Sequence, residues 1–115
     1  LVRNLMGIDE NNGLLAIGEM LNTGQPLQFC RRDPASAEAD MRRMLRELKA
    51  RAPRPKGAVY YTCVGRGPNL FDAKSGELRI IQEELGDLPL TGFYCNGEIS
   101  NNRLYGYTGV LTLFL

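Results

Sequence analysis

The first third of the chain alternates short apolar runs with polar turns, as extended segments do. Residues 1–8, 14–18 and 27–32 each carry the pattern of a strand. Asn12 and Gly13, between the first two runs, are residues that accept the positive φ angles of a tight hairpin. The pattern therefore predicts a meander of three strands at the start of the chain.

The next segment has helical spacing. Asp33 is a favourable N-cap and Pro34 is a favourable first helical residue. Pro53 and Pro55 end the pattern, because proline interrupts a helix. The apolar residues that form one face of this helix are Ala37, Met41, Met44, Leu45, Leu48 and Ala52. The segment therefore predicts one long amphipathic helix.

The second half of the chain follows the pattern of a strand–helix–strand unit with a hairpin added. Strand-like runs span residues 57–64, 90–95 and 104–115. Ser75 is a candidate N-cap for the intervening helix, and Gly86 is placed to end it. The apolar stripe of that helix consists of Leu78, Ile81 and Leu85. If the first two strands are parallel neighbours, their connection is right-handed.

Together these elements predict the α+β class, in one domain over residues 1–115. We expect a single mixed β-sheet of about six strands, made of the N-terminal meander, the βαβ unit and the hairpin, with two helices packed on it. A chain of 115 residues is long enough for a single core.

Composition excludes several classes of function. The net charge is +1, so the chain has no strong overall field for nucleic acid or an acidic membrane. It contains no histidine, which excludes Ser-His and Cys-His nucleophile pairs, imidazole proton transfer and histidine metal ligands. No signal-peptide or membrane-spanning pattern is present, so we expect a cytoplasmic protein. The chain begins at Leu1 without a methionine, and we expect further sequence upstream.

Three cysteines, Cys30, Cys63 and Cys95, lie far apart in the sequence. An odd count without Cys-x-x-Cys spacing argues against a disulfide framework and a zinc site, so we expect reduced thiols, no metal and no cofactor. In a rival interpretation, Cys63 or Cys95 is the nucleophile of an enzyme and Arg66 favours its thiolate. Without histidine such an enzyme needs another base, so we expect no enzymatic activity.

Residues 42–56 are rich in basic side chains, with Glu47 as the one acid among them. The basic residues are Arg42, Arg43, Arg46, Lys49, Arg51, Arg54 and Lys56. One interpretation is a surface for an acidic partner, which makes the chain a protein-interaction module. The other is the solvated face of an amphipathic helix and a basic linker, and it is favoured because no aromatic residues interleave with the charges.

Two strand ends resemble each other. Cys63-Val-Gly65 and Cys95-Asn-Gly97 both follow aromatic strand residues. If the strands are parallel neighbours, both corners lie at the carboxyl edge of the sheet, where open sheets usually hold ligands. The candidate ligand-binding residues there are Cys63, Arg66, Asn69, Cys95, Asn96 and Glu98. A guanidinium suits a carboxylate and a carboxylate suits an ammonium, so this set suits a zwitterion such as an amino acid.

Several stretches resemble one known family. In the second half they are Gly57–Phe71, Gly92–Ile99 and Leu104–Phe114, and in the first they are Leu1–Asp9 and Gly24–Asp33. The block Gly-Phe-Tyr-Cys-Asn-Gly-Glu-Ile, followed by a closing strand, is the most specific of them. On these residues the chain resembles the FIST C-terminal domain, which covers most of its length.

The resemblance implies a sensory or input domain of intracellular signal transduction that binds a small ligand, with an amino acid as the usual suggestion. It implies as partners that ligand and an upstream FIST N-terminal domain of the same protein, which residues 1–115 do not contain. We therefore expect the domain to be truncated at its N-terminus. We expect no nucleic-acid or membrane partner, and the sequence leaves the oligomeric state open.

Overall fold

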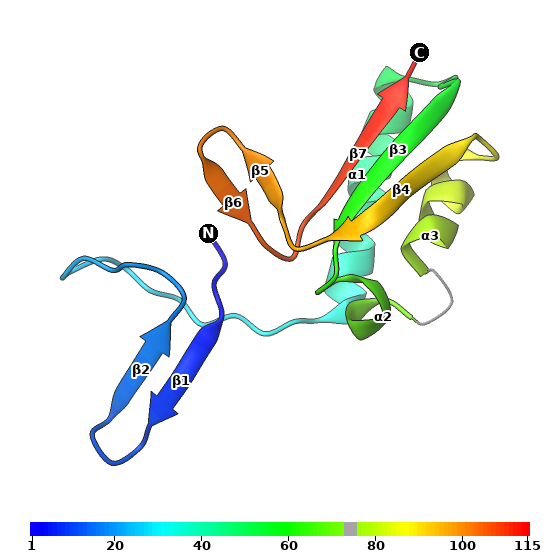
Figure 1. Cartoon of the computed structure of the whole chain (residues 1–115). Helices are drawn as coiled ribbons and strands as arrows, with labels where there is room; N and C mark the ends of the chain where they lie inside the picture. The colour runs from blue at the N-terminus through cyan, green and yellow to red at the C-terminus, as the bar shows by residue number, and fades with distance from the viewer. Residues whose placement is uncertain (73–75) are drawn as a thin grey trace. The chain divides into compact units, whose positions relative to one another are not determined.

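The computed structural model describes residues 1–72 and 76–115, and the chain divides into two compact units (Figure 1). The first unit is Leu1–Arg31 and the second is Arg32–Leu115. Ser75, the predicted N-cap of the second helix, lies outside the described residues.

The first unit contains a β-hairpin of β1 (Leu5–Asp9) and β2 (Leu14–Ile17). At the turn, Asp9 Oδ1 accepts a hydrogen bond of 3.1 Å from the backbone N–H of Asn12. Gly13 has a φ of +64°, the left-handed conformation that the hairpin requires. The first two predicted strands and their turn are therefore confirmed.

The prediction of a third strand over residues 27–32 is wrong. These residues belong to no strand ladder, and Leu27 and Phe29 are exposed. A strand is defined by hydrogen bonds to a neighbour as well as by an extended backbone, and this apolar run has no such neighbour.

The second unit begins with helix α1 (Pro34–Arg51). The Asp33 carboxylate caps it, accepting a hydrogen bond of 2.8 Å from the backbone N–H of Ser36. At the other end, the N–H of Ala52 bonds the carbonyl of Leu48 at 2.8 Å. Both ends of the helix confirm the prediction from the sequence.

A three-stranded sheet is the centre of this unit, with the strand order β4-β3-β7. Its strands are β3 (Gly57–Cys63), β4 (Leu90–Cys95) and β7 (Gly109–Phe114). β3 runs parallel to β4 and antiparallel to β7. The chain passes from β3 to β4 through the short helix α2 (Gly67–Leu70) and the helix α3 (Gly76–Leu85). The parallel pair predicted from the sequence is thus confirmed.

The long final strand predicted over residues 104–115 is instead two strands. β6 (Arg103–Tyr105) forms a small hairpin with β5 (Glu98–Ser100), and β7 follows separately. Tyr107 lies between them with a φ of 60°, which no regular strand accommodates. The chain therefore changes direction at this residue.

The α+β class is confirmed, but the expected single sheet of about six strands is not formed. The described residues contain three small sheets, β1–β2, β4-β3-β7 and β5–β6. They contain a third, short helix besides the two expected. The single sheet fails because the third N-terminal strand has no partner and the final strand is interrupted, so no continuous ladder joins the hairpins to β3.

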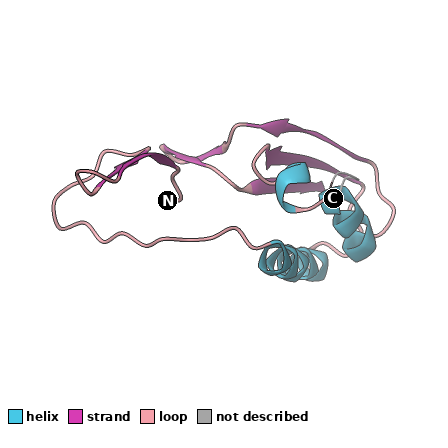
Figure 2. Cartoon of the chain, turned by 90° about the horizontal axis from the view of Figure 1, so that it is seen from below, coloured by secondary structure: helices cyan, strands magenta, loops and turns pink. Residues whose placement is uncertain are grey.

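The core lies between the three-stranded sheet and the helices, which Figure 2 shows together on one side of that sheet. Ile80 and Ile81 of α3 are 2% exposed and fully buried, respectively. Leu45 of α1 is 3% exposed. The partly buried residues packed against them are Met41, Phe71, Leu85, Leu90 and Leu111. Burial of this apolar surface is the main stabilising term for the unit.

Ion pairs join α1 to the last turn of α3. Arg42 donates to Glu83 at 2.6 Å and to Glu84 at 3.1 Å, and Arg46 donates to Glu84 at 2.9 Å. Lys49 Nζ bonds the backbone carbonyl of Glu84 at 2.7 Å. Much of the basic segment predicted over residues 42–56 is therefore engaged within the chain, which favours its interpretation as a helix face over a partner surface.

We predict that Ile81→Ala lowers the free energy of unfolding by about 2–5 kcal/mol, because it leaves a cavity in a fully buried position. Urea unfolding followed by circular dichroism measures the change. Ile99→Ala is the matched control, since Ile99 is 77% exposed and should lose little. Equal losses in the two variants would contradict this location of the core.

We also predict a pH-dependent contribution from Glu84. Hydrogen bonds from Arg46 and then Arg42 lower the pKa of Glu84 below its ordinary value of 4.5. A group with a depressed pKa in the folded state stabilises it above the ordinary value and loses that contribution as the pH falls through the folded value. The urea midpoint of the wild type should therefore exceed that of Glu84→Gln at about pH 7, and the difference should shrink towards about pH 3.

Glu10→Gln, an exposed change in the hairpin turn, is the control for Glu84→Gln. A difference between wild type and Glu84→Gln that stays constant with pH would refute the role given to this carboxylate.

Candidate functional site

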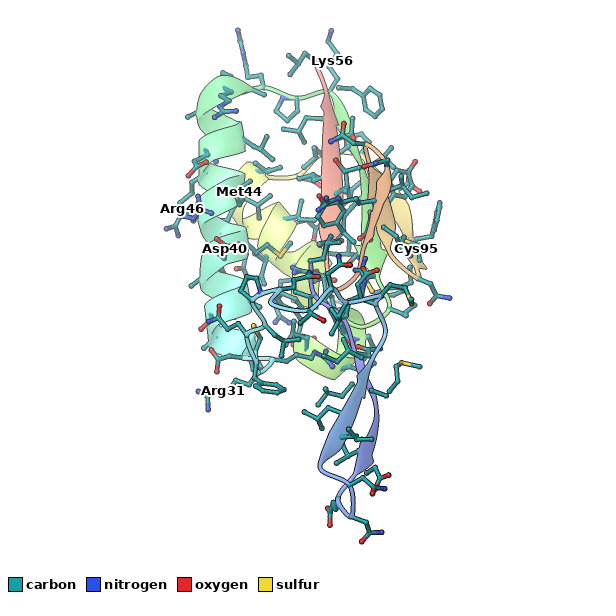
Figure 3. The ribbon with its side chains drawn as sticks, turned by 90° about the vertical axis from the view of Figure 1, so that its left-hand side faces the viewer. Arg31, Asp40, Met44, Arg46, Lys56 and Cys95 are labelled. Atoms are coloured by element: carbon teal, nitrogen blue, oxygen red, sulfur yellow. The ribbon has the colours of Figure 1, made fainter. Side chains whose placement is uncertain are left out.

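The two similar strand ends lie side by side, as the sequence predicts. Cys63 of β3 is the register partner of Cys95 of β4. Two residues earlier, Tyr61 and Phe93 are also partners, with ring centroids 4.9 Å apart. Paired residues of parallel strands share a face of the sheet, so all four side chains belong to the face away from the helices. Figure 3 shows Cys95 across the sheet from α1.

At this outer corner, Cys95 and Glu98 are in contact. The Cys95 thiol donates to Glu98 Oε1 at 3.2 Å and lies 3.6 Å from the carbonyl oxygen of Thr62. The Thr108 hydroxyl also donates to the Glu98 carboxylate. Of the two thiols, Cys63 is buried and Cys95 is partly exposed.

The environment of Cys95 keeps its thiol protonated. Burial raises the pKa of Cys95, and the hydrogen bond to the Glu98 carboxylate raises it further. A catalytic thiolate needs the opposite, a neighbouring positive charge that lowers the pKa. The geometry therefore weighs against Cys95 as a nucleophile.

Arg66 makes its contacts away from this corner. Its Nε donates to Glu77 Oε1 at 2.8 Å, and its guanidinium lies 5.0 Å from the centre of the Phe71 ring. Arg66 and Glu98, which the sequence analysis assigns to the two ends of one zwitterion, thus have different partners. Of the remaining predicted residues, Asn69 makes a long hydrogen bond of 3.5 Å to the carbonyl of Val64, and Asn96 is exposed.

The structure adds a site that the sequence analysis missed, around Glu77 in the first turn of α3. Its side chain is 4% exposed. Glu77 Oε1 accepts hydrogen bonds from the Tyr60 hydroxyl at 2.7 Å and from Arg66 at 2.8 Å, and Oε2 accepts one from the Thr62 hydroxyl at 2.9 Å. We call these four residues the Glu77 cluster.

Local sequence explains how the cluster forms. Tyr60 and Thr62 are two residues apart in β3, so their side chains lie on the same face of the sheet, the one that faces the helices. An acidic residue in the first turn of a helix is favoured by the helix dipole. The signal available in the sequence was this pair of hydroxyl residues on one face of a strand, with an acid at the start of the next long helix.

Charge in the cluster is compensated rather than free. Although burial disfavours the charged guanidinium, the hydrogen bond to Glu77 holds the pKa of Arg66 above its ordinary value. Burial and then the hydrogen bond to Glu77 raise the pKa of Tyr60, so its hydroxyl is a donor at physiological pH. The cluster is therefore one buried ion pair with two neutral hydroxyl donors.

A cleft of about 340 Å³ opens beside the Glu77 cluster. Its residues come from β3, from the first turn of α3 and from β4: Tyr60, Thr62, Glu77, Leu78, Leu90, Thr91, Gly92, Phe93 and Tyr94. One part of the lining is polar, with hydroxyls and a carboxylate, and the other is apolar. Binding clefts for small molecules commonly combine these two kinds of lining.

Residues 1–72 and 76–115 contain no group of three or more acidic or cysteine side chains that could hold a metal ion. No helix within the same residues is long and apolar enough to cross a membrane.

Comparison with known proteins gives a family match and several relatives. The family model described as "FIST C domain" matches residues 1–101. The uncharacterized protein Rv0628c of Mycobacterium tuberculosis is 37% identical over the whole chain, which spans 31% of that relative. The uncharacterized protein Mb0898c of Mycobacterium bovis is 38% identical over 99% of the chain and 31% of its own length.

A plant relative also matches: an F-box/LRR-repeat protein of Arabidopsis thaliana is 29% identical over 83% of the chain and 19% of its own length. The chain thus spans about a third of the mycobacterial relatives. No solved structure matches it.

The contact between Cys95 and Glu98 generates a prediction about thiol reactivity. Glu98→Gln removes the negative charge beside the thiol, so the pKa of Cys95 should fall and more thiolate should be present at about pH 8. Alkylation of Cys95 by iodoacetamide, followed by mass spectrometry of its peptide, should then be severalfold faster than in the wild type. Cys30, which is exposed, serves as the internal reference. An unchanged ratio of the two rates would rule out this influence of Glu98.

Proposed function

Because the chain belongs to the FIST C domain family, we propose that the cleft beside the Glu77 cluster binds a small ligand with an amino group, such as an amino acid. FIST C domains are sensory-type domains of signal transduction and are not a known enzyme family. Ligand binding in this cleft is then the input that the domain senses.

The observation that carries the proposal is the buried carboxylate of Glu77 in the wall of an open cleft. A carboxylate has about four positions for hydrogen-bond donors, and Glu77 accepts three hydrogen bonds from Tyr60, Thr62 and Arg66. Among the described residues Oε2 receives only the Thr62 hydroxyl, and we propose that the ligand supplies its second donor. An ammonium group is the donor that such an oxygen binds most strongly.

The rest of the lining suits the remainder of an amino acid. The volume of about 340 Å³ lies at the small end of the range for ligand clefts, which favours a compact molecule. Leu78 and Leu90 provide an apolar wall for a side chain. The hydroxyls of Thr91 and Tyr94 can donate to a carboxylate.

The same observations support binding over catalysis. The chain has no histidine, and the Cys95 thiol is held in its protonated form. The Glu77 carboxylate is fixed by its three donors and paired with Arg66. A charge held in this way is suited to recognition, whereas a general base must exchange its proton during the reaction.

The amino group of the ligand gives a test that leaves the protein unchanged. We predict that leucine at about 100 times its dissociation constant adds about 2.7 kcal/mol of stability, visible as a rise in Tm. The analogue 4-methylpentanoic acid, which lacks the amino group, should give no rise at the same concentration, because it has no ammonium group to donate to Glu77 beside Arg66. Differential scanning fluorimetry with a panel of amino acids and their deamino analogues makes the comparison.

Two variants locate the binding. Glu77→Gln should abolish the rise with the amino acid, whereas Glu98→Gln, at the outer corner predicted from the sequence, should retain it. A rise lost in Glu98→Gln and kept in Glu77→Gln would place the ligand at the residues Cys63, Arg66, Asn69, Cys95, Asn96 and Glu98 instead. Equal rises with leucine and its deamino analogue would refute recognition of the amino group.

A further inference from the structure

The cleft extends from the helix-facing side of the sheet, where Tyr60, Thr62 and Glu77 line it, to the outer edge of β4. Five consecutive residues of this strand, 90–94, line it. Side chains alternate between the two faces of a strand, so a cleft on one face would meet every second residue. Consecutive residues line the same cleft when it runs along the edge, where both the backbone and side chains of the two faces are within reach.

Within the described part of the Arg32–Leu115 unit, this edge has no strand beside it. β4 is at one end of the order β4-β3-β7, with β3 as its neighbour. Phe93 and Tyr94 are 63% and 50% exposed, although both belong to a strand. An unpaired strand edge presents a row of hydrogen-bond donors and acceptors.

The hydrogen bonds to β3 show which backbone groups point outwards. The carbonyls of Pro89 and Cys95 each accept a 2.8 Å bond from β3 or its continuation. Because N–H and C=O groups alternate in direction along a strand, Thr91 and Phe93 share that direction, whereas Leu90, Gly92 and Tyr94 point to the open edge. Gly92 is exposed and has no side chain to cover its backbone.

Glycine at position 92 is also required by the packing. A Cβ atom there would collide with the backbone carbonyl oxygen of Tyr60. The glycine that this close approach requires therefore places no side chain over the middle of the cleft.

The Glu77 cluster makes one end of this edge polar, whereas the other end is apolar. Tyr60 and Thr62, which bond Glu77, are the register partners of Gly92 and Tyr94. The carboxylate is therefore level with the carboxyl end of β4, and Leu90 marks the apolar opposite end of the cleft.

We propose that the cleft binds the N-terminal segment of a peptide, which adds to the open edge of β4 as an antiparallel strand with its ammonium group at Glu77. This inference rests on the proposed function and specifies its ligand class. An ammonium at Glu77 and a chain running towards Leu90 fix the antiparallel direction. The span from Tyr94 to Leu90 accommodates about three residues at about 3.3 Å each. Backbone pairing of this kind is a common mode of peptide recognition.

The test uses the complete chain and synthetic ligands. Isothermal titration calorimetry compares alanine amide with the amide of the tripeptide Ala-Leu-Ala, whose N-terminus is free. The tripeptide amide should bind at least tenfold more tightly, because it adds backbone hydrogen bonds along β4. Its N-acetylated form, without the ammonium group, should lose binding by at least tenfold.

Methylation of the peptide backbone tests the strand geometry itself. Alternate residues of an added strand direct their N–H groups to β4, so N-methylation of the second or the third residue should have opposite effects. One methylated peptide should bind at least tenfold more weakly, and the other should stay within about twofold of the parent. Because the protein is the wild type in every titration, no result depends on the folding of a variant.

The outcomes distinguish the two proposals. If alanine amide and the tripeptide amide bind equally, or if the two methylated peptides behave alike, the strand addition is refuted and the amino-acid site stands. If the acetylated peptide binds as tightly as the free one, the assignment of the ammonium to Glu77 is refuted. If neither the peptides nor the free amino acids bind, the proposed function fails, and this inference fails with it.

Discussion

The buried carboxylate of Glu77 is the constraint on which the second unit depends. An unpaired charge at 4% exposure would cost several kcal/mol, and the fold compensates it with donors from two elements. Tyr60 and Thr62 bring β3 to the carboxylate, and Arg66 brings the loop that leaves β3. Satisfying one charge therefore fixes the start of α3 against the sheet, and the cleft between α3 and β4 is a consequence of that position.

Local sequence signals predicted the elements whose stability is decided by neighbouring residues. Asp33 and Pro34 predicted the start of α1. In the structure, Asp33 is the N-cap and the helix begins at Pro34. The turn at Gly13 was also predictable from the sequence, because glycine readily adopts the positive φ that a tight hairpin requires. The parallel pairing of β3 and β4 was predicted from the strand–helix–strand pattern, and the ladder places their similar ends, at Cys63 and Cys95, opposite each other.

Features decided by distant residues were not predictable in this way. Residues 27–32 have the composition of a strand but no ladder partner, and strand residues are stabilised by that partner. Tyr107 carries no sequence signal for a positive φ, yet it divides the predicted final strand. Glu77 has the sequence context of an ordinary surface acid at a helix start, and its donors Tyr60 and Thr62 precede it by 17 and 15 residues. The burial that turns it into a site appears only when β3 and α3 pack.

Helix α3 connects the cleft to the rest of the unit. Its first turn carries Glu77 in the wall of the cleft, and its last turn carries Glu84, which accepts hydrogen bonds from Arg42 and Arg46 of α1. Between these ends, Ile81 is fully buried against the sheet, so the helix is held at three points along ten residues. A ligand changes an equilibrium only to the extent that it contacts two states differently. A ligand bound at Glu77 would act on a helix that also contacts α1, and coupling of this kind is what a sensory domain uses.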